Sequence, residues 1–469
     1  MKFILASLFL LIFVSLKSQS AWDLQQCITY ATNHNISLKQ SALNNEINKN
    51  NTLQSKANIL PTLNLGASHT YNFGQTIDRF TNTFANTQVL SQNFYVSSNL
   101  VLWSGLSQYN TIKANEFTYL SGVENLKQQQ TDLALNVANA YITVIFTDEL
   151  LKIAKNQYDI TKEQLERTQK LVSAGALAKS VEYDVKAQLA TEDVNVTSSD
   201  NNYELAVLNL KQLLNLDTVT NFAIVRPVIE VQENALISNN IQFVYESALK
   251  NQPGVKSAEY TIKSAEKSLL ATKGRVSPTI SLNGSMGTGY SGLGSEFVGA
   301  NIIGYQASGI TNKGDTVYSP LTDIITRKKP FTDQFKDNVN KSIGFTLSVP
   351  IFNGLQTHTA VKNAKINALN AKFSQDLVEQ NLYKTIAQAY ANAKAALNKY
   401  NATKISVEAA NESFKYAQQK FNAGAISAFD FNSAKNRLFI AESNLVQSKY
   451  DYIFKLKVLD YYQGKPLTL

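Results

Sequence analysis

The longest regular hydrophobic pattern in the chain lies between Leu106 and Ala174. Apolar residues recur there every seven positions, and only Gln130 interrupts the series Val123, Val137, Val144, Leu151, Tyr158, Leu165 and Val172. A seven-residue spacing sustained over this length predicts a helix that packs along other helices. At about 1.5 Å per residue, this helix extends on the order of 100 Å, so an ordinary compact domain cannot contain it.

This stretch recurs 249 residues later in the chain. Tyr141 corresponds to Tyr390, and the turn Ala174–Gly175–Ala176 corresponds to Ala423–Gly424–Ala425. The correspondence runs without a gap, which a biased composition alone does not produce. The sequence therefore predicts two internal repeats, at residues 21–216 and 241–469, joined by a linker at 217–240.

Each repeat also predicts a β-hairpin, because apolar and polar residues alternate along two segments. The hairpins span about 61–104 and about 278–353, and the apolar residues of each strand fall on one face. Those assigned to this face are Leu63, Leu65, Val96, Leu100, Ile280, Leu282, Phe345 and Leu347. Strands of about ten residues suit either a membrane-crossing hairpin or a water-soluble hairpin with one buried face, and the strands alone leave both open.

Helices complete each repeat. In the first repeat we expect a helix at 22–58 that can break near residues 33–35, the long helix at 106–174 and a shorter returning helix at 180–214. In the second repeat the long helix is expected at 355–423 and the returning helix at 427–463. The first strands of the two hairpins match at a shift of 217 residues and the second strands at 249, so the difference of 32 residues predicts an inserted loop at about 289–340.

The N-terminus has the layout of a cleavable secretory signal at residues 1–20. Lys2 precedes an apolar run from Phe3 to Leu16, and small or polar residues follow before Ala21. We therefore expect the mature chain to leave the cytoplasm. Four strands on one chain leave two sheet edges unpaired, and unpaired backbone groups in lipid cost several kcal/mol each, so a membrane location requires closure by several copies of the chain.

The charged and reactive residues form no recognisable chemical site. The formal charge is +8, but Lys and Arg are spread among Asp and Glu, which indicates solvated helix faces rather than a nucleic-acid surface. Cys27 is the only cysteine, so an intrachain disulfide is impossible, and we expect a partly buried thiol. The three histidines lie in unrelated elements, and the GxGxxG match at 287–292 ends a strand without a following helix. No cofactor, metal or enzymatic activity is predicted.

With its two repeats of helix, hairpin, long helix, turn and helix behind a signal sequence, the chain resembles the TolC-type outer-membrane efflux proteins. The approaches to the turns, 171–175 and 421–424, carry the same resemblance. It implies a mixed α and β membrane protein: a homotrimer with a twelve-stranded outer-membrane β-barrel, four strands per chain, continued by a long periplasmic α-helical barrel. The implied function is a passive exit duct of a tripartite efflux or type I secretion system, with a periplasmic adaptor and an inner-membrane pump as partners. A periplasmic or surface coiled-coil spacer is the main alternative, although it needs no apolar strand faces; a secreted hydrolase would need a clustered site that the sequence lacks.

The resemblance also implies roles for particular residues. Adaptor docking falls on the two helical turns, at Val172, Ala174, Gly175, Ala176, Ala423, Gly424 and Ala425, and the apolar strand residues face lipid. A periplasmic gate falls on Phe421, Ile426, Asp430, Ser433 and Asp184. Asp430 lies where some members carry an acidic residue that narrows the mouth, but Ser433 replaces the second acid, while Phe421 and Ile426 replace a latching tyrosine and arginine. The alternative for Asp430 is an ordinary solvated helix residue. The expected mouth is therefore closed by packing rather than by a salt-bridged ring.

Overall fold

The structure, a computed structural model, describes residues 21–86, 88–216, 222–227, 229, 231 and 240–468. The predicted signal at 1–20 and most of the predicted linker at 217–240 lie outside the described residues. The chain divides into two units. The helical unit comprises Met1–Asn48, Thr118–Ile262 and Asn370–Leu469, and the sheet unit comprises Lys49–Phe117 and Lys263–Leu369.

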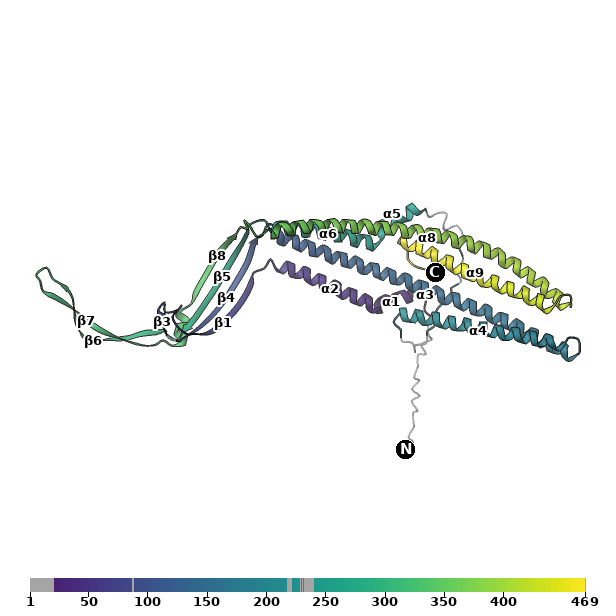
Figure 1. The fold of residues 1–469 in the computed structure, drawn as a ribbon, viewed down its shortest axis with the longest axis horizontal. Helices are drawn as coiled ribbons and strands as arrows, with labels where there is room; N and C mark the ends of the chain where they lie inside the picture. Colours follow the sequence, from purple (N-terminus) through teal and green to yellow (C-terminus); the bar gives the residue numbers. More distant parts are fainter. Residues whose placement is uncertain are drawn as a thin grey trace, which may run out of the picture. The chain divides into compact units, whose positions relative to one another are not determined.

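Helices of matching length occur in the two halves of the chain (Figure 1). The long helices α3 (Ser107–Ser173) and α8 (Gln356–Asn422) have 67 residues each, and the returning helices α4 (Lys179–Leu213) and α9 (Ala428–Tyr462) have 35 each. The helices before the hairpins also match in length: α1 (Leu24–His34) and α5 (Ile241–Asn251) have 11 residues, and α2 (Ile36–Ala57) and α6 (Pro253–Gly274) have 22. None of the helices in the described ranges is long and apolar enough to cross a membrane.

The interruption between α1 and α2 has a local cause. Asn35 has an extended backbone, which ends α1, and its side-chain oxygen accepts a hydrogen bond from the Leu38 amide at 3.0 Å. An asparagine that caps the next helix in this way is a common helix start. The stretch 22–58 is therefore interrupted at Asn35, within the segment 33–35 where the sequence allows a break.

The core of the helical unit surrounds the middle of α3. Val137, Val144 and Leu151 of the seven-residue series are buried there, whereas Val172 near the end of the helix is only half-buried. Tyr141 is 1% exposed, and its hydroxyl donates to the backbone oxygen of Val225 at 2.6 Å. Burial along the series is thus concentrated in the central turns of this helix.

The sheet unit contains one four-stranded antiparallel sheet. Its order is β1 (Thr62–Asn72), β4 (Val89–Trp103), β5 (Thr279–Ser291) and β8 (Asn340–Ser348), so β1 and β8 are its edges. The two hairpins join through the β4–β5 pair, and the loop of the first hairpin holds the short strands β2 (Thr76–Ile77) and β3 (Phe84–Ala85).

The insertion expected at about 289–340 lies between β5 and β8, but it is not an irregular loop. These residues form a further hairpin, β6 (Ser295–Ile310) and β7 (Thr316–Lys328), followed by the short helix α7 (Phe331–Asp337) (Figure 1). The pairing slips by one residue at three places in β6, and Gly299, Gly304 and Gly309 follow the slips at intervals of five residues. Each slip is a β-bulge, which breaks the two-residue alternation by which a strand is detected in a sequence.

Candidate functional site

Both long helices end in the same hydrogen-bonded turn. After α3, the Ala176 amide donates to the Leu171 carbonyl at 2.9 Å and the Gly175 amide donates to the Val172 carbonyl at 3.0 Å. Gly175 has φ of +73°, which side chains with a Cβ rarely adopt. The pattern is the Schellman motif, in which a glycine ends the helix and satisfies its last carbonyls.

The turn after α8 repeats this geometry. The Ala425 amide donates to Lys420 at 2.8 Å, and Gly424 has φ of +70°. The residues at 174–176 and 423–425 are exposed, and no atom lies within 4 Å of the place that a Cβ would occupy at either glycine. Each turn therefore presents a smooth surface of small apolar residues, although nothing in this geometry identifies a partner.

Asp430 lies in the first turn of α9, where it takes part in the helix cap. The Asp430 amide donates to Ser427 Oγ at 3.2 Å, and the Ser427 hydroxyl lies 2.7 Å from the Asp430 carboxylate. A carboxylate at this position is also favoured by the helix dipole. Capping of α9 is therefore sufficient to explain an aspartate at position 430, and no gating role is needed to explain it.

Phe421 packs inside the α8–α9 turn. Its ring stacks on Phe431, with centroids 4.7 Å apart and planes 19° apart, and Phe431 also contacts Phe414. Phe431 is 4% exposed, so it is the centre of the cluster, and the sequence reasoning missed it. Of the remaining predicted gate residues, Ile426 and Ser433 are half-buried, and Asp184 lies exposed on α4 beyond the other turn.

A buried charged cluster joins α9 to α3 and α4. Lys435 of α9 lies 2.8 Å from the Glu192 carboxylate of α4, and both side chains are almost fully buried. Thr161 of α3 hydrogen-bonds to both, and Gln188 donates to Glu192 at 2.8 Å. Burial lowers the pKa of Lys435, and the hydrogen bond and charge of Glu192 only partly offset this effect. The pair therefore specifies one arrangement of three helices more than it stabilises the fold.

The register of the sheet brings all the predicted lipid-facing residues onto one face. Leu65 pairs with Val96, and Leu282 pairs with both Leu100 and Phe345, while Ile280 pairs with Leu347 and Leu63 lies two residues from Leu65. Residues directly opposite each other in an antiparallel sheet share a face. Leu65 is 82% exposed and Phe345 75%, so much of this apolar face is bare in the single chain.

The other face of the sheet is polar across all four strands. Asn99 donates to Asn283 at 2.6 Å, and Asn283 donates to Thr346 at 2.9 Å, so a row of side chains crosses three strands. Tyr95 is an aromatic exception. A Cβ at Gly66 would lie 2.4 Å from the Tyr95 ring, which shows that this ring covers the neighbouring glycine.

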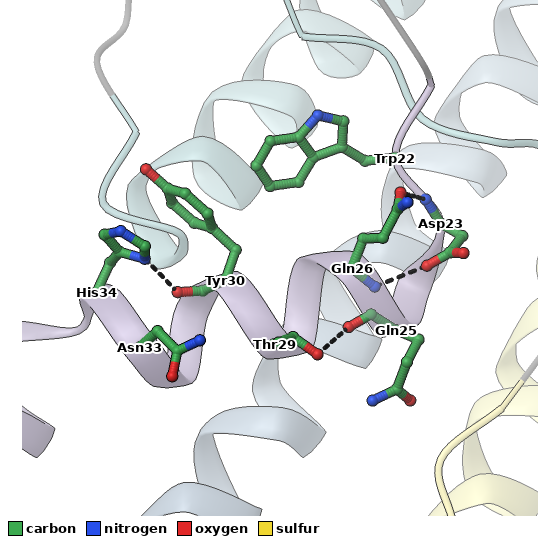
Figure 2. Close-up of a pocket in the computed structure, with 8 residues that line it drawn as sticks. All are labelled: Trp22, Asp23, Gln25, Gln26, Thr29, Tyr30, Asn33 and His34. Carbon is green, nitrogen blue, oxygen red and sulfur yellow. Dashed lines mark hydrogen bonds between the residues drawn. The ribbon is translucent and has the colours of Figure 1, made fainter.

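A cavity of about 520 Å³ lies beside α1 (Figure 2). Trp22, Tyr30 and His34 line it, with the Tyr30 and His34 rings stacked at 3.9 Å, and Asp23 caps the helix through the Gln26 amide. Within the described ranges, no group of three or more His, Cys, Asp or Glu side chains could hold a metal. All the residues that line this cavity belong to α1 or to the two residues before it, and they form neither a metal site nor a catalytic pair.

Cys27 lies on α1 with its side chain fully buried. Burial, and to a smaller degree the charge of Asp23, raises the pKa of its thiol to about 12. The thiolate is the reactive form, so this cysteine is an inert core residue.

Comparison with known proteins identifies the family of this chain. The model of the outer membrane efflux protein family matches residues 28–216 and 244–461. The chain belongs to this family. Outer membrane protein TolC of Escherichia coli (strain K12) is 26% identical over 445 residues, which cover 92% of this chain and 80% of TolC. Alkaline protease secretion protein AprF of Pseudomonas aeruginosa is 20% identical over 419 residues, covering 87% of this chain and 77% of AprF.

Solved structures of outer-membrane channels share the fold. CusC superposes with a TM-score of 0.75 at 15% identity, covering 94% of this chain and 92% of that chain. VceC from Vibrio cholerae gives a TM-score of 0.72 at 14% identity, covering 94% and 96%.

Family membership confirms the function predicted from the sequence. The chain is an outer-membrane channel protein for efflux or secretion, and its relatives are channel proteins rather than enzymes. The surfaces that the single chain leaves exposed include the apolar face of the sheet and the two helical turns.

Proposed function

We propose that three copies of this chain form one outer-membrane exit duct. The observation that carries the proposal is the four-stranded sheet, which has one bare apolar face, one polar face, and the edge strands β1 and β8. In lipid, edge backbone groups need partners, and pairing β8 of one copy with β1 of the next satisfies them. Three copies then give a closed barrel of twelve strands.

In this barrel the polar face lines a water-filled lumen. The side chains of Asn99, Asn283 and Thr346 hydrogen-bond to one another across three strands. Such a polar row suits the inner face of a barrel wall, which contacts water, while the outer face contacts lipid. Leu65 and Phe345 then face the hydrocarbon of the outer membrane. The helices continue the duct into the periplasm.

The two halves of the chain descend from one unit. The matching helix lengths support this, as does the fact that the family model covers each half separately. In a trimer, six similar units would then form the wall of the duct. Such near-symmetry is typical of closed assemblies.

The helical turns are the docking sites of a periplasmic adaptor, which connects the duct to an inner-membrane pump. Gly175 and Gly424 allow another helix to approach the backbone closely, and the neighbouring alanines offer a small apolar surface. Related proteins are named for protease secretion and for toluene efflux, so the cargo is either a polypeptide or a small apolar molecule.

The mouth of the duct is closed by packing. Phe421 and Phe431 hold the α8–α9 turn together, and the cluster of Lys435, Glu192 and Thr161 holds α9 against α3 and α4. Opening is a conformational equilibrium that the docked partner shifts.

Purification from outer membranes followed by native mass measurement and planar-bilayer recording tests the proposal. We expect a trimer and discrete conductance steps. A monomeric mature protein without conductance would instead support the coiled-coil spacer, which requires neither barrel nor pore.

A further inference from the structure

The β6–β7 ribbon has two chemically different faces. Successive side chains of β7 point to opposite faces along the whole strand, because the three bulges lie in β6 rather than in β7. Each paired β6 residue lies on the same face as its β7 partner: Tyr305 shares a face with Pro320, and Gln306 shares the other face with Ser319. One face carries six large apolar residues that are 58–76% exposed, namely Phe297, Ile302, Tyr305, Ile310, Tyr318 and Ile324. We call this surface the apolar ribbon face.

The opposite face is more polar and less exposed where it is apolar: its large apolar residues are Val317, Leu321 and Ile325, which are 41–44% exposed. Glu296 forms an ion pair with Arg327, Asn301 pairs with Asp323, and glycines lie opposite the apolar residues of β7 on this side. The contrast matters because every side chain of an isolated two-stranded ribbon is accessible to water. Some exposed apolar residues are therefore expected on either face, but the apolar ribbon face carries twice as many large ones as the opposite face, and each of them is more exposed, so this face is the one that requires cover.

The ribbon needs a partner for its own stability. A two-stranded hairpin is marginal in water, and three bulges reduce the regularity of this one. The three aromatic rings on the apolar ribbon face, at 150–250 Å² each when fully buried, together with the three isoleucines, offer on the order of 600 Å² of apolar surface. A stable interface takes about 800 Å² from each partner, so this face supplies most of one.

We propose that the apolar ribbon face packs against the same face of the other copies of this chain. The inference rests on the proposed trimer. When β1 and β8 pair between copies, the ribbons of all three start at the same end of one barrel. Tethering of this kind gives an effective concentration in the millimolar range, which an unconnected partner protein does not reach. The ribbons therefore bury their apolar faces against each other and tie the copies together beyond the barrel.

Two neighbouring positions on β6 provide a matched test. Tyr305→Cys places a thiol on the apolar ribbon face and Gln306→Cys places one on the polar face, while the buried Cys27 stays silent. In outer membranes, a short bismaleimide should link most Tyr305→Cys chains into covalent dimers and fewer than about a tenth of Gln306→Cys chains. Equal linking at both positions, or none at Tyr305→Cys, overturns the proposal.

A second measurement separates this inference from the trimer itself. Replacing residues 295–328 by two glycines should leave a trimer with conductance but lower the temperature at which it dissociates in detergent. A trimer with an unchanged dissociation temperature overturns the ribbon contact alone, whereas loss of the trimer already in the unmodified protein overturns the proposed function.

The same cysteine distinguishes other occupants. A fluorophore on Tyr305→Cys that is quenched by spin-labelled lipid shows that the apolar ribbon face lies on the bilayer. A fluorophore that is neither quenched by lipid nor shielded from aqueous quenchers shows a face left free for an outside protein. Either result overturns packing between copies.

Discussion

Arginine at Leu65 should prevent assembly in the membrane, whereas arginine at the neighbouring Asn64 should not. The two residues are adjacent on β1 and point to opposite faces of the sheet. Leu65 belongs to the bare apolar face and is 82% exposed in the single chain, while Asn64 lies on the polar face, opposite Ser97. The pair therefore has the same depth and the same added charge, and differs only in environment.

The free-energy cost of arginine at position 65 depends on how far this residue lies from the bilayer midplane. Leu65 lies two residues from the centre of β1, which at about 3.3 Å per residue and a tilt near 40° is roughly 5 Å from the bilayer midplane. Arginine costs about 2–4 kcal/mol at the midplane and less toward the interface, so about 2 kcal/mol per chain is a fair estimate. Three chains lose about 6 kcal/mol together, which is a factor of roughly 10⁴ in the assembly equilibrium.

The assay is the amount of trimer that unboiled outer-membrane samples retain on a denaturing gel, with total protein as reference. We expect little or no trimer for Leu65→Arg and a near-normal amount for Asn64→Arg, whose ion selectivity should shift toward anions because the added positive charge lies in the lumen. If Asn64→Arg is the variant that fails, or if both assemble equally, the assignment of the two faces is wrong.

Three further predictions concern the helices and the lumen. Gly175→Val and Gly424→Val should each strain their turn by at least about 1–2 kcal/mol and reduce export while the trimer persists; normal export and adaptor cross-linking would remove the turns from the docking site. Phe431→Ala should loosen the α8–α9 turn and increase single-channel conductance, and an unchanged closed state would show that the aromatic stack holds no gate. Ser97→Cys should react with a membrane-impermeant thiol reagent and Val96→Cys should not, against the unreactive background of Cys27; the reverse order would invert the sheet.

Much of the helical part could be predicted from the sequence. A seven-residue series fixes the length and face of a helix, and proline-free stretches ending in glycine fix its limits, so α3 begins and ends within a residue of the expected 106–174. Alternation likewise identifies one face of the sheet, because Leu65, Val96 and Phe345 fall on the apolar side of their strands and the register places them on the same face.

The inserted ribbon could not be predicted, for a physical reason. A bulge at every fifth residue shifts the alternation of β6 just as it becomes detectable, and the glycines that make the bulges possible resemble those of a loop. Phe431 was missed because its partner Phe421 lies ten residues away across a turn, a spacing with no helical or strand period. Lys435 was missed because a sequence does not show that a lysine on a charged helix is buried.

Both contacts that close the proposed mouth are shielded from solvent. The stack of Phe421 on Phe431 is apolar, and the ion pair of Lys435 with Glu192 is almost fully buried, so dissolved ions screen neither of them well. A ring of exposed salt bridges would weaken as ionic strength rises. This mouth should therefore keep its closed conductance between low and high salt, and it should open when Lys435→Met removes the charge that ties α9 to α3 and α4.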